Sequence, residues 1–373
     1  MFCSLNRTFD PDMKDEGMKY IQDAEDLLQR LIATPSVSRE EAAAADIIEE
    51  TLRSYGYEPQ RKGNNVWAIS PHFIENRPTV LLNAHIDTVK PVSSWTRAPF
   101  TPTLEGDRLY GLGSNDCGGG LVSLLQVFRI LTHRNAAGMP RTSLPSSFNL
   151  IYLASCEEEV SGSNGIVLAL PELPKVDVAI VGEPTGMQPA VAEKGLMVLD
   201  VVAHGKSGHA ARDEGVNAIY EALDDLTWFR SYQFERVSDF LGPTKMQVTV
   251  INAGTQHNVV PDECRMVVDV RTNELYSNEE VFNIIKQHTH SEVTARSFRL
   301  SSSHIDIEHP LIQRCVALGL TPFGSPTLSD QALMPFPSFK LGPGNSARSH
   351  SADEYIGISE IAQAIDLYLQ ILQ

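Results

Sequence analysis

The segment Leu81–Asp87, LLNAHID, decides the fold, because an apolar run of strand type ends there in two polar residues. The same pattern recurs at Ile151–Gly165 (IYLASCEEEVSGSNG), Val178–Thr185 (VAIVGEPT) and Leu341–Glu354 (LGPGNSARSHSADE). Polar residues at the carboxyl ends of strands line the sites of open α/β sheets. The sequence therefore predicts an α/β protein whose functional site is built from several strand ends.

Strands and helices are expected to alternate around these segments, which predicts a doubly wound α/β sheet. Residues before about Tyr20 read as a polar extension. The expected helices are 26–32, 40–55, 118–132 and 358–372, and the expected strands are 65–69, 79–84, 149–154 and 178–181. The segment 310–320 is expected to complete this domain together with the last helix.

Between residues 191 and 301 the pattern changes to β-α-β-β-α-β. This order predicts an inserted α+β, ferredoxin-like domain. The expected division is therefore 1–190 with 302–373 for the first domain and 191–301 for the second. The inserted strands are expected at 197–203, 246–252, 264–271 and 293–300, and its helices at 215–229 and 278–289.

The amino-acid composition limits the classes of function that this protein can have. A chain of 373 residues exceeds the size at which one hydrophobic core stops growing, so two domains are expected. The formal net charge of −17 argues against a nucleic-acid or anionic-membrane partner. The five cysteines are scattered and indicate neither a disulfide framework nor a thiolate zinc site. No apolar stretch has the length of a signal peptide or a membrane span. A location in the reducing cytoplasm is therefore expected.

Five acidic and imidazole side chains stand out as candidate metal ligands: His85, Asp116, Glu159, Glu183 and His350. His85 and Asp87 point to one face of a strand, so the Asp87 carboxylate is expected to accept the imidazole N–H and fix the metal-binding tautomer. A surface His-x-Asp pair is the alternative. Asp116 lies in GLGSNDCGGG, where a carboxylate at the sixth position argues against a dinucleotide fingerprint.

The run Glu157–Glu159 also has two interpretations. A run of acidic residues is usually a solvated loop. At the end of a buried strand, however, adjacent carboxylates repel one another unless a cation is present. Mixed imidazole and carboxylate ligands suit zinc, with cobalt or manganese also possible.

In this order and context the five residues resemble the metal ligands of the co-catalytic zinc amidohydrolases and peptidases of the M20 type, over about Asp23 to the C-terminus. Leu112, Cys117 and Gly118 depart from the residues that many members carry. The resemblance implies that Asp116 bridges two metals, His85 and Glu183 bind one, Glu159 and His350 bind the other, and Glu158 is the general base. Register slippage to Glu157 would change that last assignment.

The resemblance extends to the inserted domain, which it implies is a dimerisation domain. His209 matches a histidine that reaches the neighbouring subunit's site and stabilises the oxyanion; a partly buried loop histidine is the alternative. Asn258 and Arg271 match substrate-contacting phrases, and an arginine suits bidentate binding of an α-carboxylate. Arg348 is expected either to meet a succinyl carboxylate or to be a surface residue.

The resemblance is greatest to the acetylornithine deacetylase branch. It implies a cytoplasmic homodimer that releases the amine of an N-acetyl- or N-succinyl-L-ornithine or -citrulline in arginine biosynthesis. Succinyl-diaminopimelate desuccinylase and dipeptidase are the alternatives of similar chemistry. A metal-free binding or regulatory dimer is the alternative of another class.

Overall fold

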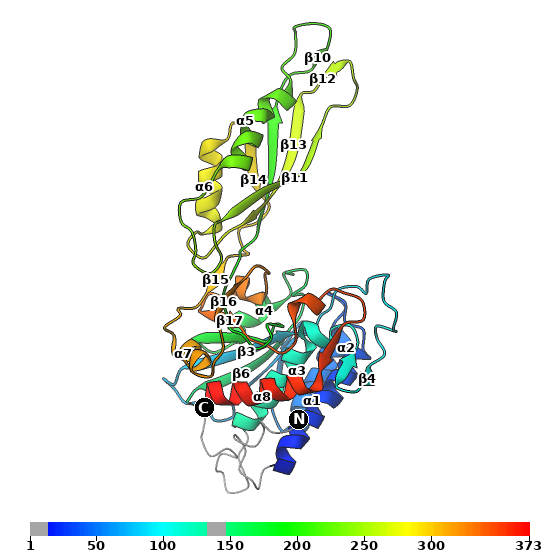
Figure 1. Cartoon of the computed structure of the whole chain (residues 1–373), viewed down its shortest axis with the longest axis vertical. Helices are drawn as coiled ribbons and strands as arrows, with labels where there is room; N and C mark the ends of the chain where they lie inside the picture. Colours follow the sequence, from blue (N-terminus) through cyan, green and yellow to red (C-terminus); the bar gives the residue numbers. More distant parts are fainter. Residues whose placement is uncertain (1–13, 133–146) are drawn as a thin grey trace. The chain divides into compact units, whose positions relative to one another are not determined.

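The computed structural model describes residues 14–132 and 147–373, which fold into two compact units (Figure 1). The first comprises the described residues up to Val191 together with Ile305–Phe323 and Ser329–Gln373. The second comprises Ala192–His304 and Gly324–Leu328. The second unit is thus inserted into the first, as the β-α-β-β-α-β segment predicts, although Gly324–Leu328 also groups with it.

A mixed sheet forms the middle of the first unit. Its four central strands, β6, β3, β7 and β17, are parallel, and β1, β2 and β8 flank them in antiparallel pairings. Seven of its strands lie in the order β1 (Gln60–Lys62), β2 (Asn65–Ile69), β6 (Asn149–Ser155), β3 (Thr79–His85), β7 (Val178–Val181), β17 (Ser338–Lys340) and β8 (Ala190–Glu193). Parallel pairing brings the carboxyl ends of β3, β6 and β7 to one edge.

Both faces of this sheet are buried. Alternate residues of β3 point in opposite directions, so Val80 and Leu82 join one core cluster while Leu81 joins another. The first cluster contains most of the helices and the second contains α4, which makes the sheet doubly wound, as predicted. The helices of this unit are α1 (Lys14–Ile32), α2 (Ala42–Ser54), α3 (Gly119–Thr132), α4 (Ile166–Ala169), α7 (Pro310–Ala317) and α8 (Ile358–Leu372).

Helix α3 approaches the sheet closely at a glycine. A Cβ added at Gly120 would lie 1.8 Å from the carbonyl oxygen of Gly182, which directly follows β7. This contact holds the start of α3 against the strand end that carries Glu183. The π-turn Ser114–Gly118 precedes α3, and a small sheet of β4 (Thr103–Glu105), β5 (Arg108–Tyr110) and β18 (Tyr355–Gly357) lies in the same unit.

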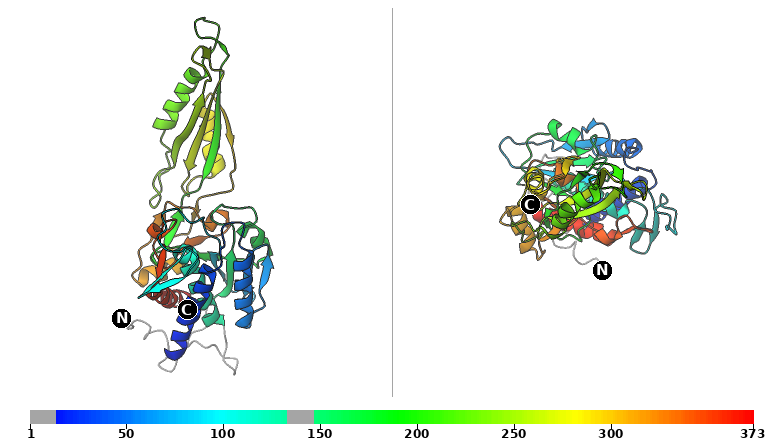
Figure 2. Two further views of the ribbon diagram at one scale, coloured as in Figure 1. Left: turned by 90° about the vertical axis from the view of Figure 1, so that its right-hand side faces the viewer. Right: turned by 90° about the horizontal axis from the view of Figure 1, so that it is seen from above.

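The second unit is a four-stranded antiparallel sheet in the order β11-β13-β9-β14, and its helices α5 and α6 share one core with it (Figure 2). The chain order β-α-β-β-α-β and this strand order are those of a ferredoxin-like domain, as predicted. A separate two-stranded antiparallel sheet pairs β10 (Gly208–His209) with β12 (Val259–Val260), which are about 50 residues apart in the chain. The main elements are β9 (Met197–His204), α5 (Ala218–Ser231), β11 (Lys245–Ala253), β13 (Glu263–Arg271), α6 (Asn278–His288) and β14 (Glu292–Ala295).

Two expected boundaries differ from those of the structure by five residues or more. Helix α1 begins at Lys14 rather than Asp26, so residues 14–20 are helical rather than a loose extension; residues 1–13 lie outside the described chain. Strand β14 ends at Ala295 rather than Leu300, because the Asn278 side chain donates hydrogen bonds to the carbonyls of Phe298 and Leu300. In the described ranges, no helix has the length and apolar character needed to cross a membrane.

Candidate metal centre

His85 is the last residue of β3, and its side chain is buried with 1% exposed. Its Nδ1 lies 2.8 Å from the backbone carbonyl oxygen of Asp87, against 3.5 Å from the nearer Asp87 carboxylate oxygen. A carbonyl oxygen only accepts hydrogen bonds, so a neutral imidazole carries its proton on Nδ1 and leaves the Nε2 lone pair free. The tautomer is the expected one, but the acceptor is the backbone of Asp87 rather than its carboxylate.

Asp116 lies in the π-turn, with one carboxylate oxygen toward each histidine. Its Oδ1 is 3.2 Å from His85 Nε2, and its Oδ2 is 3.7 Å from His350 Nε2. The buried Glu354 carboxylate accepts the backbone N–H groups of Gly113, Asn115 and Asp116 at 2.8–3.1 Å, which fixes this turn. The arrangement matches that of a carboxylate able to bridge two cations.

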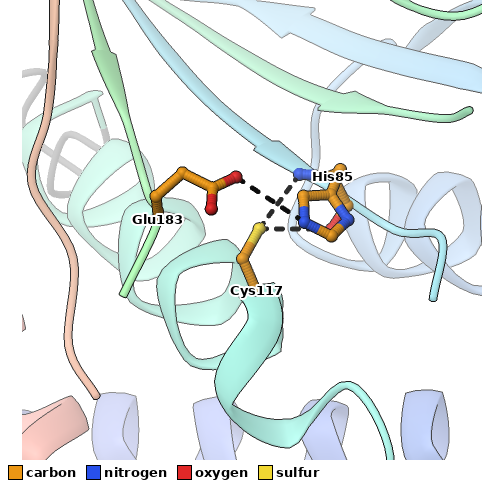
Figure 3. Close-up of side chains that lie close together, drawn as sticks. All are labelled: His85, Cys117 and Glu183. Atoms are coloured by element: carbon orange, nitrogen blue, oxygen red, sulfur yellow. Dashed lines mark hydrogen bonds and ion pairs between the residues drawn. The ribbon is translucent and has the colours of Figure 1, made fainter. Parts of the chain in front are cut away.

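Glu183 follows β7 and faces His85 from the neighbouring strand end. Its Oε1 is 3.6 Å from His85 Nε2 and is buried without a hydrogen-bond partner. Figure 3 shows Glu183, His85 and Cys117 pointing toward one another, and their ligand-type atoms all lie within 4.8 Å. The Cys117 sulfur accepts the His85 backbone N–H at 3.2 Å and is buried, which agrees with a small core residue beneath the site.

The other half of the cluster joins Glu159 to His350. Glu159 Oε2 lies 2.9 Å from His350 Nε2, and this contact raises the pKa of His350 to about 9. The His350 backbone has a φ of 57°, in the left-handed region that non-glycine residues adopt at a cost in energy. The structure therefore places the five candidate ligands in one cluster, grouped as His85 with Glu183 and as Glu159 with His350, with Asp116 between the two groups.

Glu158 and Glu157 point to different surroundings. Glu158 Oε2 is 4.0 Å from His85 Nε2, and burial raises the pKa of Glu158 well above its usual range, with further increases from nearby carboxylates. The Glu157 carboxylate instead accepts hydrogen bonds from the backbone and side-chain nitrogens of Asn164 at 3.2 and 2.9 Å. Glu157 holds its own loop, which leaves Glu158 as the carboxylate beside the cluster.

The cluster has the electrostatics of a cation site. Burial raises the pKa of Glu183 to about 8 and that of Asp330 to about 6, because several carboxylates share a region with little solvent. The unpaired Oε1 of Glu183 adds an oxygen that needs a positive partner. Imidazole and carboxylate donors in this number suit divalent zinc or similar ions, so the residues fit two metal ions of the expected kind.

His209 and Asn258 lie side by side in the second unit, where β10 pairs with β12. The Asn258 carbonyl accepts the Ala210 N–H at 3.0 Å, and the exposed His209 ring accepts the Ala211 N–H on Nδ1 at 3.1 Å. A neutral His209 ring bonded in this way carries its proton on Nε2. That N–H is available as a hydrogen-bond donor.

Arg271 and Arg348 have protein partners. Arg271 makes a bidentate pair with Asp269, at 2.8 and 3.0 Å, so binding a substrate carboxylate there requires sharing or breaking that pair. Arg348 pairs with Glu360 at 2.7 Å and lies 4.4 Å from the centre of the Tyr355 ring. Both contacts are within the protein, so they account for the position of Arg348 without a substrate. They favour the alternative that Arg348 is a surface residue over contact with a succinyl carboxylate.

Three supporting residues were not singled out from the sequence. Glu354 holds the Asp116 turn, Asp330 accepts the Ser155 hydroxyl at 2.6 Å, and Ser38 donates to the Asp87 carboxylate at 2.7 Å. Glu354 lies in the same phrase as His350, which was a usable signal. Ser38 and Asp330 are far in sequence from the residues they support, and no local pattern marks them.

Two protein families match overlapping parts of the chain. Residues 191–294 match the peptidase dimerisation domain family, and residues 65–242 match peptidase family M28. Among solved structures, the aminopeptidase PepT from Bacillus cereus is 17% identical with a TM-score of 0.73, over 94% of this chain and 98% of that one. The YXEP protein of Bacillus subtilis, a dinuclear metal-binding peptidase of the M20 family, is 18% identical with a TM-score of 0.70, over 95% and 98%.

A metallo-carboxypeptidase of the M20 family from Sulfolobus solfataricus is likewise 18% identical, with a TM-score of 0.68 over 94% of this chain and 98% of that one. These likenesses define a two-part metallopeptidase fold. More narrowly, it is the fold of the M20 peptidases, with an α/β domain and an inserted domain that matches a peptidase dimerisation family.

Proposed function

We propose that this protein is a metal-dependent hydrolase that cleaves the amide bond of an N-acyl-L-amino acid. The observation that carries the proposal is the placement of Asp116, whose two carboxylate oxygens face His85 at 3.2 Å and His350 at 3.7 Å. Glu183 and Glu159 complete the two groups. Such a cluster suits a pair of divalent ions, zinc or cobalt, rather than a metal-free binding protein.

The chain's own residues have separate roles in this proposal. When bound, the two ions supply Lewis acidity that polarises the scissile carbonyl and makes a water molecule more acidic. Glu158 is not one of the five candidate metal ligands. Its carboxylate takes a proton from the attacking water and returns it to the leaving nitrogen. The Nδ1 contact to the Asp87 carbonyl keeps His85 in the tautomer that binds metal through Nε2.

The proposed substrate is an N-acetyl- or N-succinyl-L-ornithine or -citrulline, as in arginine biosynthesis. Support comes from the GEPT phrase at 182–185 and the TLSDQALMPFPSFKLGPGNSARSH stretch at 327–350, which resemble the acetylornithine deacetylase branch. A dipeptide or tripeptide is the second candidate, since the solved structures of similar fold include a tripeptidase from Staphylococcus aureus and a human carnosine dipeptidase.

A substrate panel separates these candidates. Purified protein, loaded with zinc or cobalt, is assayed on acyl-ornithines, acyl-citrullines, acyl-diaminopimelate and dipeptides, with Glu158→Gln as the inactive control. Cleavage of the ornithine or citrulline derivatives is the expected result. Cleavage of dipeptides alone would contradict the substrate assignment but leave the hydrolase proposal standing, whereas no cleavage of any amide would favour a binding protein.

A homodimer is part of the proposal, supported by the match of residues 191–294 to a dimerisation domain. His209 is then expected to donate its Nε2 proton to the oxyanion in the partner subunit's site. His209→Ala should lower kcat by about 10²- to 10³-fold. Mixing His209→Ala with Glu158→Gln chains should restore activity, because a mixed dimer has one site with both residues intact. If activity does not return after verified subunit exchange, His209 does not act across subunits.

Arg271 is proposed to bind the substrate α-carboxylate, with Asn258 near the scissile amide. Because Arg271 already makes a bidentate pair with Asp269, lysine cannot reproduce both that pair and the substrate contact. Arg271→Lys is expected to raise KM about tenfold or more with little change in kcat, if the contact is equally strong in ground and transition states. Steady-state kinetics checks this, with Arg265→Lys on the same strand as the control; equal KM values for wild type and Arg271→Lys would remove Arg271 from substrate binding.

A further inference from the structure

The Asp87 carboxylate is buried between two parts of the chain that are far apart in sequence. Asp87 is 1% exposed, and it comes two residues after the candidate ligand His85. The imidazole N–H of His85 is already satisfied at 2.8 Å by the backbone carbonyl of Asp87. The carboxylate is therefore available for other partners.

Those partners are the backbone N–H groups of the two adjacent glutamates. Asp87 Oδ1 accepts the Glu158 N–H at 3.0 Å, and Oδ2 accepts the Glu159 N–H at 3.1 Å. Oδ2 also accepts the Ser38 hydroxyl at 2.7 Å. One carboxylate thus binds consecutive amides, and a serine from the loop before α2 holds that carboxylate in turn.

These hydrogen bonds to the backbone of Glu158 and Glu159 matter because the two side chains point in different directions. Glu159 reaches His350 at 2.9 Å, while the Glu158 carboxylate lies 4.0 Å from His85 Nε2. Glu157, just before them, has a φ of 53°, so the chain reverses sharply as it leaves β6. A backbone that bends here without fixed amides would not hold the two carboxylates in different directions.

We propose that Ser38 and Asp87 are positioning residues for the turn at Glu158 and Glu159, and that Asp87 acts through these amides rather than by orienting the His85 ring. The consequence for catalysis rests on the proposed function, since it assumes that Glu158 is the general base. The hydrogen-bonding role itself does not depend on that assumption.

Asp87→Asn keeps the shape of the side chain but gives it one acceptor oxygen and an NH₂ group that faces an amide donor. We expect kcat to fall about 10²-fold, with KM within about twofold and metal affinity unchanged. Ser38→Ala removes one donor and is expected to lower kcat by about threefold to tenfold. Ser36→Ala, in the same loop, is the matched control, because Ser36 contacts Thr88 through its backbone carbonyl.

Amide hydrogen exchange at single-residue resolution gives a readout that does not need activity. Glu158 and Glu159 should exchange at least about tenfold faster in Asp87→Asn than in wild type, and faster in Ser38→Ala than in Ser36→Ala. Faster exchange in a protein that cleaves no amide would support the positioning role and reject the proposed function. Unchanged exchange would overturn the positioning role, even in an active enzyme.

Metal titration separates the two roles that Asp87 could have. If Asp87→Asn bound metal at least tenfold more weakly and regained wild-type kcat at saturating metal, Asp87 would act through His85 and the proposal would be wrong. Should Asp87→Asn fail to fold, Ser38→Ala decides the matter by the same exchange and kinetic measurements.

Discussion

Replacing Glu158 with glutamine is expected to lower kcat by about 10²- to 10⁴-fold while leaving the metal content of the protein near the wild-type value. Glutamine has nearly the same size, but its amide cannot take a proton from water. Because the Glu158 carboxylate lies beside the cluster without a contact to His350, its loss should not remove a metal ligand. Steady-state kinetics and metal analysis of the same preparation check both parts.

Glu159→Gln is the matched comparison, since it makes the same chemical change one residue later. The Glu159 carboxylate is 2.9 Å from His350 Nε2, so this variant should lose metal as well as activity. If Glu158→Gln lost metal and Glu159→Gln kept it, the two roles would be reversed. Glu157 is not a third candidate, because its carboxylate is bonded to Asn164.

Replacing Asp116 with asparagine is expected to have a comparable effect by a different route. Asparagine offers one oxygen where aspartate offers two, so it cannot face both His85 and His350 with an acceptor. Metal content should fall from two ions per chain to one or fewer, and kcat should fall by about 10³-fold or more, because Lewis acidity worth several kcal/mol is lost.

Glu105→Gln is the control for Asp116→Asn, since it removes a negative charge from an exposed residue that pairs with Arg97. Its metal content and kcat should match those of wild type. If Asp116→Asn retained two ions with wild-type affinity, Asp116 would not bridge them, and the expected division of ligands would be wrong.

Much of the fold could be predicted from sequence because burial leaves a strong local signal. The apolar runs at 65–69 and 178–181 match β2 and β7 at both ends, and 358–372 matches α8. Strands buried on both faces read as continuous apolar stretches, and their ends are marked where polar residues begin. The helix before Asp26 was missed because its first turns are rich in charged and polar residues, although the buried Tyr20, Ala24 and Leu28 recur at helical spacing.

The candidate site was predictable in its members but not in its internal contacts. Parallel pairing of β3 with β6 and β7 brings His85 to the same sheet edge as the Glu157–Glu159 run and Glu183, and sequence order is enough to expect that. Which oxygen faces which nitrogen depends on backbone geometry. The His85 ring bonds the Asp87 backbone carbonyl, and a two-residue spacing does not tell which oxygen of Asp87 is the acceptor.

Contacts between distant residues were the hardest to predict. Ser38 is 49 residues from Asp87, and Asp330 is 175 residues from Ser155, so only the folded chain brings them together. The Arg271–Asp269 pair is different, because residues two apart on a strand share a face and the pair could have been expected. Arg348 precedes β18 and pairs with Glu360 in the first turn of α8, a contact that no spacing rule marks.

The central claim is that His85, Asp116, Glu159, Glu183 and His350 form a site for two metal ions that supports amide hydrolysis. The most direct measurement is calorimetric titration of zinc into metal-free protein, followed at each addition by hydrolysis of the acyl-amino-acid and dipeptide panel. Two ions should bind per chain, with amide cleavage appearing as the sites fill and with Asp116→Asn binding one ion or fewer. Binding of no metal by correctly folded wild-type protein, or full occupancy by two ions with no cleavage of any amide, would contradict this account.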